Sequence, residues 1–422
     1  MNIQEYDVLN ALRAEPAASQ RMLAENCGHS LGMVNRCLKE LARAGYLNED
    51  RQLTPLARRE FARRAPRNAV ILAAGPGIRM IPINTEVPKA FLEIDGEPLI
   101  ERLLKQLHEA GIWDVYVVTG YKKEQFEYLI DDYGVQLIVN PDYSLKNNLY
   151  SLRLAAAHLD NSYILPCDIW CGKNPFSSHE LYSWYMVSEQ ADEAGMVRAN
   201  RKGELVRVPR GQSGNAMPGI AYLLKDDCDA LRTRMEQLCE NPESHGFFWE
   251  AALFNGAKMT VNARLVLAGE VIEINTYEQL RQRDSASPQL ESDKLNVIAA
   301  VLGAGTGDIT DITVLKKGMT NRSFLFTCRE SRYIMRIPGE GTDRLIDRRQ
   351  EAAVCRLIQD RQICEDIVFI DPDSGYKITW FIEGARTCDA SNPDEVTRCM
   401  DKLRAFHRMG LKTGHAFNIF EH

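Results

Sequence analysis

The periodicity of apolar positions changes along the chain and predicts three domains, at residues 1–66, 67–285 and 286–422. In the middle segment short apolar runs alternate with longer amphipathic patterns, as in NAVILAAG, PLIERLLKQLHEAG, DVYVVTG, KKEQFEYLIDDYG and VQLIVN. Strands that alternate with helices of about ten to fifteen residues predict a parallel α/β sheet. The polar stretch RQRDSASPQLESDK, residues 281–294, has no periodicity and predicts a linker. A helix, a hairpin-like pair of apolar runs and further helices follow it.

The first 66 residues have the pattern of a helix-turn-helix followed by a small wing. A short helix near residues 19–26 and a longer amphipathic helix near 30–43 flank a turn with glycine, and a strand–turn–strand pattern follows. The segment resembles the winged-helix domains of bacterial regulators, which implies a recognition helix that exposes Ser30, Asn35, Arg36 and Lys39. Its excess of basic residues suits DNA, but a winged helix used for dimerisation or docking would carry the same arginines on a solvated face. DNA is therefore one expected partner, and docking is the alternative.

Composition and cysteine usage narrow the class of protein. The chain has 422 residues, 45% hydrophobic and 26% charged, as ordinary globular proteins do, and its net charge of −7 argues against general coating of nucleic acid. No apolar run approaches the ~20 residues of a membrane helix, and the N-terminus lacks the layout of a signal peptide. The eleven cysteines are scattered through periodic segments, as buried thiols in a reducing compartment are, so we expect a cytoplasmic protein. Cys167 and Cys171 have no second pair beside them and do not predict a zinc site.

A glycine-rich loop with fixed positive charge follows the first strand of the middle segment. The stretch LAAGPGIRMIPINTEVPK, residues 72–89, carries Arg79 and Lys89. Backbone N–H groups of such a turn can surround a phosphate, and a loop between a strand and a helix is where α/β proteins bind nucleotides. The loop lacks the third glycine of G-x-G-x-x-G and the G-K-[ST] ending of a P-loop.

The same stretch matches L-A-A-G-x-G-x-R-M-x-P-x-T-x-x-x-P-K in register, and so resembles the nucleotidyltransferases that join nucleoside triphosphates to sugar or alcohol phosphates. The resemblance implies a Rossmann-like domain in which Lys89 bridges the attacking phosphate and the α-phosphate. Arg79 and the loop amides would bind the β- and γ-phosphates. The nucleotide-binding loop residues would be Leu72, Ala73, Ala74, Gly75 and Gly77.

The resemblance also implies Mg²⁺ as the cofactor. Asp168 follows the apolar strand SYILP, where this family places a metal-binding aspartate. The stretch VIEINTYEQL, residues 271–280, resembles the family's E-I-D-[ST]-x-E-x-L, but Asn275 stands where the second metal aspartate is expected. Glu273 would share a strand face with Asn275 and could supply the missing charge.

Two further stretches resemble the base- and ribose-binding loops of the family. They are TGYKKEQF and LKNNLYSLRLAA, and they make Gly120, Tyr121, Asn148 and Ser151 nucleotide-binding candidates. As bare sequence, NNLYSL could equally be a helix N-terminus with asparagine caps.

The form of NNLYSL and the later GFFWE are most similar to the bacterial CTP:phosphocholine cytidylyltransferases. That resemblance implies CTP and phosphocholine as substrates, and CDP-choline and pyrophosphate as products of a direct in-line attack. A quaternary ammonium is usually held by aromatic faces and a carboxylate, which suggests a cage of Trp249, Glu250, Tyr222 and Trp170. Each aromatic alone could equally be a core residue. The alternatives are transfer to a sugar 1-phosphate or phosphoethanolamine, or a winged-helix regulator that uses this fold as a ligand sensor.

The C-terminal segment resembles the amino-terminal lobe of choline kinases and aminoglycoside-type phosphotransferases. The stretches that carry this resemblance are KKGMTNRSFLF, YIMRIPGEGTDRLIDRRQEA and the hinge-like ITWFIEGA. The resemblance implies an ATP-phosphate loop and an ion pair between a strand cation and a helix carboxylate, contributed by Gly318, Asn321, Ser323, Arg336 and Glu351. Nothing after residue 385 reads H-x-D-x-x-x-x-N, so we expect an incomplete kinase lobe that does not phosphorylate choline. The pattern gives no oligomeric state.

Overall fold

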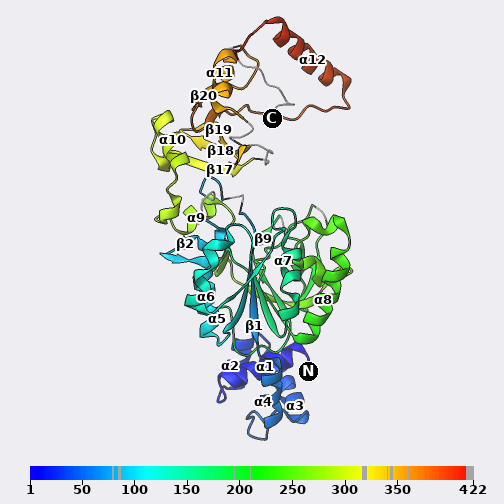
Figure 1. Ribbon diagram of the computed structural model, residues 1–422. Coiled ribbons are helices and arrows are strands. Elements are labelled where there is room, and N and C mark those ends of the chain that lie inside the picture. The colour runs from blue at the N-terminus through cyan, green and yellow to red at the C-terminus, as the bar shows by residue number, and fades with distance from the viewer. Residues whose placement is uncertain are drawn as a thin grey trace. The chain divides into compact units, whose positions relative to one another are not determined.

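The computed structural model describes residues 1–77, 80–83, 87–193, 195–209, 211–315, 321–339, 341–342, 346–359 and 361–414. It divides into two compact units, one of Met1–Gly77 with Val87–Ile274, and one of Ile78–Glu86 with Asn275–His422. Each unit is described by itself below (Figure 1). No helix in the described ranges combines the length and the apolar character that crossing a membrane requires.

The first unit begins with a winged helix. Its helices are α1 (Ile3–Ala14), α2 (Gln20–Cys27), α3 (Leu31–Arg43) and α4 (Pro55–Arg64), and a bridge between Leu47 and Leu53 forms the wing. Ser19 and Ser30 cap α2 and α3, because each hydroxyl accepts the amide proton of the residue three positions on. Ser30 therefore serves as a helix cap, while Arg36 and Lys39 are exposed on α3 as expected.

The winged helix is packed onto the α/β part of the same unit. Leu181 belongs to the hydrophobic core of the winged helix, and the Tyr182 hydroxyl donates to Asp7 at 3.0 Å. The Asn161 amide donates to the carbonyls of Arg63 and Ala65 at 2.8 and 3.1 Å. Because Asn161 directly precedes β6 (Ser162–Pro166), these contacts lie at the amino-terminal ends of the central strands.

A twelve-stranded mixed sheet forms the centre of the first unit, with β14 paired only to β15. In sheet order the other strands are β5 (Gln136–Val139), β4 (Asp114–Thr119), β1 (Asn68–Ala73), β6, β13 (Ala221–Leu223), β8 (Trp184–Ser188), β15 (Lys258–Val266), β11 (Glu204–Arg207), β10 (Val197–Ala199), β12 (Gly214–Asn215) and β9 (Ala191–Asp192), and β14 spans Phe254–Asn255. The pairs among β5, β4, β1 and β6 are parallel, whereas β13 runs antiparallel to both β6 and β8. The expected parallel sheet therefore forms four strands of a larger mixed sheet.

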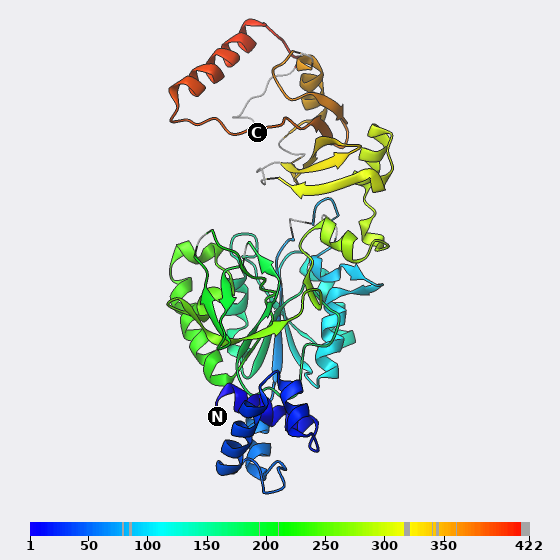
Figure 2. The ribbon, with the colours of Figure 1, turned by 180° about the vertical axis from the view of Figure 1, so that it is seen from behind.

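Helices cover both faces of this sheet (Figures 1 and 2). Buried side chains of helix α5 (Leu99–Glu109) and Leu129 of α6 (Tyr128–Tyr133) belong to the hydrophobic core on one face. Helices α7 (Asn148–Leu154) and α8 (Lys225–Cys239) pack with the other. Two small antiparallel pairs complete the unit, β2 (Glu93–Ile94) with β3 (Glu97–Pro98) and β7 (Ile169–Cys171) with β16 (Val271–Glu273).

The second unit is built on a five-stranded antiparallel sheet. Its strand order is β17 (Ile309–Val314), β18 (Asn321–Cys328), β19 (Ser331–Pro338), β21 (Lys377–Trp380) and β20 (Ile367–Ile370), and its helices are α9 (Tyr277–Arg283), α10 (Asp293–Leu302), α11 (Arg348–Ile358) and α12 (Pro393–Arg408). Tyr277 of α9 belongs to the core of this unit, so helix α9 and the start of α10 occupy the ends of the stretch expected to be a linker.

Candidate active site

The glycine loop lies at the carboxyl edge of the parallel strands. The Cys167 amide donates to the Leu72 carbonyl at 3.2 Å, and the Tyr121 amide donates to the Ala74 carbonyl at 3.1 Å. The segments that follow β1, β4 and β6 therefore meet at one edge, opposite the edge that holds the winged helix. Ligands of open α/β sheets bind at the carboxyl ends of the strands.

A buried ion pair joins two of the expected catalytic residues at this edge. Lys89 Nζ lies 2.7 Å from Asp168 Oδ2, although 79 positions separate the residues in the chain. Only 8% of Lys89 is exposed. The Ile274 amide donates to the Asp168 carbonyl at 2.9 Å, which fixes the backbone that carries the aspartate. A lysine held at a phosphate-binding edge is able to neutralise phosphate oxygens.

A second carboxylate of interest is buried in the 3-10 turn Trp249–Leu253. Glu250 is 7% exposed, and its Oε1 accepts the Tyr185 hydroxyl proton at 2.9 Å. Its Oε2 is buried and has no hydrogen-bond partner among the described residues. Burial raises the pKa of Glu250 to about 7, and the Glu273 carboxylate adds to the rise, while hydrogen bonds from its own backbone and from Tyr185 oppose it. A buried carboxylate oxygen without a donor is a site where a bound cation would be stabilised.

Aromatic side chains and a close backbone contact surround Glu250. The Trp249 ring is 1% exposed and its centroid lies 5.9 Å from that of Tyr185. Gly219 lies between Glu250 and the end of β6, because a Cβ there would be 3.0 Å from Pro166 Cγ and 4.0 Å from Glu250 Oε1. Glu250 is thus linked, through Gly219, to the strand end that leads to Asp168.

The expected nucleotide residues have defined structural partners. Asn148 Oδ1 accepts the Trp249 amide proton at 2.8 Å, and Ser151 Oγ accepts from Asn140 at 3.0 Å. Asn147 caps α7, as the alternative interpretation of NNLYSL requires. Gly120 packs so closely on the glycine loop that a Cβ would lie 2.8 Å from the Ala74 carbonyl oxygen.

Two protein families match segments of this chain. The MobA-like NTP transferase domain family matches residues 69–238, and a winged helix-turn-helix DNA-binding family matches residues 1–48. The choline-phosphate cytidylyltransferase of Haemophilus influenzae is 32% identical over 173 residues, which cover 40% of this chain and 74% of that protein. The chain belongs to the choline-phosphate cytidylyltransferase-like nucleotidyltransferases.

Two other relatives of this cytidylyltransferase domain match over a longer part of the chain. The choline-phosphate cytidylyltransferase of Streptococcus pneumoniae is 29% identical over 218 residues, 51% of this chain and 95% of that protein. The 2-aminoethylphosphonate cytidylyltransferase of Lancefieldella rimae is 29% identical over 225 residues, 51% of this chain and 92% of that protein. A solved CTP:phosphocholine cytidylyltransferase from S. pneumoniae is 26% identical with a TM-score of 0.49, and the match covers 52% of this chain and 98% of that one.

One aromatic residue of the expected cage packs in another part of the cytidylyltransferase domain. Tyr222 is fully buried in the core that lies on the other face of the sheet from Trp249, and its hydroxyl donates to the Arg64 carbonyl. This placement contradicts its assignment to the cage, because both the ring and the hydroxyl are already used. The Trp170 ring lies 5.3 Å from the guanidinium of Arg102 on α5, and its place in the cage stays a prediction.

Tyr185 is a neighbour of Glu250 that the sequence did not indicate. It donates a hydrogen bond to Glu250 and packs on Trp249, yet it lies in a strand, WYMVS, that reads as plain core. Arg79 and Gly318 lie outside the described residues. Asn275 is the first residue of the second unit, and its role stays a prediction.

In the second unit, the expected strand cation and helix carboxylate do meet. The Arg336 guanidinium on β19 donates to Glu351 on α11, and Arg348 donates to the same carboxylate at 3.1 Å. Burial tends to raise the pKa of Glu351, but the hydrogen bonds and charges of the two arginines outweigh it and hold the pKa below its ordinary value. Ser323 on β18 lies opposite Arg336 in the sheet register, and Asn321 begins the same strand.

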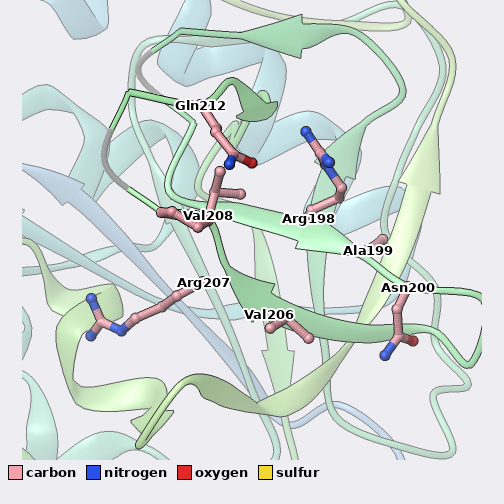
Figure 3. A pocket seen from close by; sticks show the side chains of 8 residues that line it. Arg198, Ala199, Asn200, Val206, Arg207, Val208 and Gln212 are labelled. Carbon is pink, nitrogen blue, oxygen red and sulfur yellow. The ribbon is translucent and has the colours of Figure 1, made fainter.

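A pocket of about 290 Å³ opens at the far end of the mixed sheet, around β10 and β11. Figure 3 shows Arg198, Val208 and Gln212 on one side of these strands and Arg207 pointing away from them. Asn200 is used in a turn, where its side chain accepts from the Lys202 and Glu204 amides, and the Arg207 guanidinium lies 3.7 Å from the Phe254 ring centroid. None of the predicted site residues lines this pocket.

Proposed function

We propose that the chain transfers a cytidylyl group from CTP to phosphocholine, giving CDP-choline and pyrophosphate. The observation that carries this proposal is the buried Glu250 carboxylate, whose Oε2 lacks a partner among the described residues, beside Trp249 and Tyr185. A quaternary ammonium donates no hydrogen bond and is held by aromatic faces and a nearby negative charge, which this group supplies. A sugar phosphate would leave the buried carboxylate without a cation.

The phosphate chemistry falls to Lys89 and the glycine loop. The Lys89 ammonium would leave Asp168 when the substrates bind and would neutralise the attacking phosphate and the α-phosphate as the new bond forms. The protein then contributes position and charge, and no covalent intermediate on the chain is required.

The Asp168 carboxylate fits Mg²⁺. Magnesium is usually held by one or two carboxylates together with substrate phosphates, so a cluster of three protein carboxylates is not needed. The described residues contain no group of three His, Cys, Asp or Glu side chains that could hold a metal ion. Asp168 would hold the ion, with Glu273 as the second donor, and the ion would stabilise charge on the leaving pyrophosphate.

Pyrophosphate release across pairs of nucleotide and acceptor tests the proposal. The panel combines CTP or UTP with phosphocholine, phosphoethanolamine, 2-aminoethylphosphonate and glucose 1-phosphate. We expect CTP with phosphocholine to react fastest, and Lys89→Ala to slow that reaction about 10²–10³-fold. Lys173→Ala removes a lysine that is 86% exposed and serves as the matched control. Preference for glucose 1-phosphate, or full activity of both Lys89→Ala and Asp168→Ala, would refute the proposal.

We further propose that the second unit is the nucleotide-binding lobe of a choline kinase-like phosphotransferase. The support is its five-stranded antiparallel sheet with the Arg336–Glu351 ion pair between β19 and α11. Such a reaction would supply the phosphocholine that the first unit consumes. We expect ATP binding without phosphorylation of choline, and ATP-dependent turnover of choline by the chain would contradict this.

DNA binding by the winged helix stays a prediction, as does a cytoplasmic location. The family that matches residues 1–48 is named for DNA binding, and Arg36 and Lys39 are exposed on α3. A gel-shift assay with upstream DNA, run beside the pyrophosphate assay, separates the classes: DNA binding without pyrophosphate release would favour the sensor alternative.

A further inference from the structure

A small cationic pocket lies between α7, the end of α8 and the 3-10 turn Pro242–Gly246. Its volume is about 40 Å³, and it is lined by Lys146, Leu149, Tyr150, Arg153, Cys239, Ser244 and His245. Two of these side chains are permanently cationic and a third can become so, whereas none is acidic. The lining therefore favours an anion.

The positive charge of this pocket is only partly neutralised. Lys146 Nζ lies 2.7 Å from Asp142 Oδ2 and 3.9 Å from the Tyr150 ring centroid. The Arg153 guanidinium lies 5.8 Å from the same centroid, and within the part of the chain that the structure describes no carboxylate forms an ion pair with it. Among the described residues, the ion pairs at this pocket thus comprise that of Lys146 with Asp142, and Arg153 keeps its charge without a carboxylate partner.

The wall of the pocket continues into residues 245–249, which end at Trp249, a residue of the proposed acceptor site. The Asn147 amide donates to the His245 carbonyl at 2.7 Å, and the Leu149 amide donates to the Phe247 carbonyl at 3.4 Å. The Trp249 amide donates to Asn148 Oδ1 at 2.8 Å. These bonds fasten residues 245–249 to the start of α7, so a ligand that draws Arg153 and His245 together would also steady Trp249.

We propose that this pocket binds a small inorganic oxyanion of the phosphate class, at a site separate from the triphosphate loop. A single water needs roughly 10–15 Å³ of such space, so about 40 Å³ accommodates a tetrahedral oxyanion but no nucleotide. Lys146 and Arg153 supply charge-assisted hydrogen bonds to its oxygens. Bound phosphate stabilises the turn before Trp249, and it lowers the KM for the acceptor that this residue helps to hold.

Isothermal titration with inorganic phosphate, at ionic strength held constant with NaCl, tests this site in the full chain. We expect one saturable site. Arg153→Gln and Lys146→Gln should each weaken binding at least about tenfold, the loss expected for one charge-assisted hydrogen bond. Arg201→Gln, an exposed arginine in the turn after β10, is the matched control and should bind phosphate normally.

Lys89→Ala separates this site from the triphosphate loop, because it should leave the phosphate affinity unchanged. Loss of binding in Lys89→Ala, normal binding in Arg153→Gln, or the absence of saturation would each overturn the proposal. The titration needs no turnover, so a failure of the proposed transferase activity would leave its result intact.

Discussion

Replacing Glu250 by glutamine should remove most of the pH dependence of phosphocholine binding between about pH 6 and 8. Burial and the Glu273 charge raise the pKa of Glu250 to about 7. With that pKa, about one carboxyl group in eleven is ionised at pH 6 and about ten in eleven at pH 8. Only the ionised form attracts a quaternary ammonium, so the KM of the unmodified enzyme for phosphocholine should fall about tenfold over this range.

Glutamine preserves the shape of the site, because its Oε1 can still accept the Tyr185 hydroxyl proton. The assay is initial-rate pyrophosphate release at saturating CTP and constant ionic strength. The substrate phosphate also titrates near pH 6, but it does so with both enzymes, so the ratio of the two KM profiles isolates Glu250. Parallel profiles for Glu250→Gln and the unmodified enzyme, or a KM that rises with pH only in the latter, would refute the assigned role.

The same substitution should alter the pH dependence of stability. The folded-state pKa of Glu250 is raised from 4.5 to about 7, so its contribution is fully present below pH 4.5 and is lost as the pH rises through 7. The shift corresponds to about 3 kcal/mol. Urea unfolding should therefore show Glu250→Gln gaining about 3 kcal/mol relative to the unmodified enzyme between pH 4.5 and 8. A constant difference across this range would contradict the raised pKa.

Three further substitutions test the glycine loop, a buried ion pair and the contact with the winged helix. Gly120→Ala should raise the KM for CTP about tenfold in initial-rate assays, because the new Cβ would lie 2.8 Å from the Ala74 carbonyl oxygen and displace the glycine loop. Arg264→Ala should lower the free energy of unfolding by about 1–3 kcal/mol in urea titrations, since it removes bonds of 2.9 and 2.7 Å to the buried Glu180 carboxylate, to which Tyr163 and Trp184 still donate. Tyr182→Phe should cost about 0.5–1.5 kcal/mol and speed proteolysis near the winged helix without changing turnover, because it removes only the 3.0 Å bond to that domain.

The elements with strong local signals could be predicted from the sequence. Helices expected near residues 19–26 and 30–43 are Gln20–Cys27 and Leu31–Arg43, because serine caps and apolar periodicity are both local properties. The strand NAVILA and the loop after it follow from the same kind of signal. The register of the glycine signature led to Lys89, and the end of the strand SYILP led to Asp168; the fold brings the two side chains within 2.7 Å.

The strands of the mixed sheet outside its parallel part could not be predicted in the same way. Strands β10 and β13 have three residues each, which is too short for a period of two to be visible. Their neighbours are fixed by pairing across long stretches of chain, as when β8 pairs in parallel with β15. Such strand pairings depend on the packing of the whole core, so no short stretch of sequence indicates them.

Tyr222 and Tyr185 show how a single residue of register decides which ring lies beside Glu250. Tyr222 and Tyr185 lie on adjacent antiparallel strands, where Tyr222 pairs with Trp184 and Ala221 pairs with Tyr185. Successive side chains of a strand point to opposite faces, so Tyr185 faces Trp249 and Glu250 while Tyr222 faces the core that contains Tyr163. Sequence reasoning could see that a cation site needs an aromatic ring, but only the pairing of β13 with β8 determines which ring reaches the carboxylate.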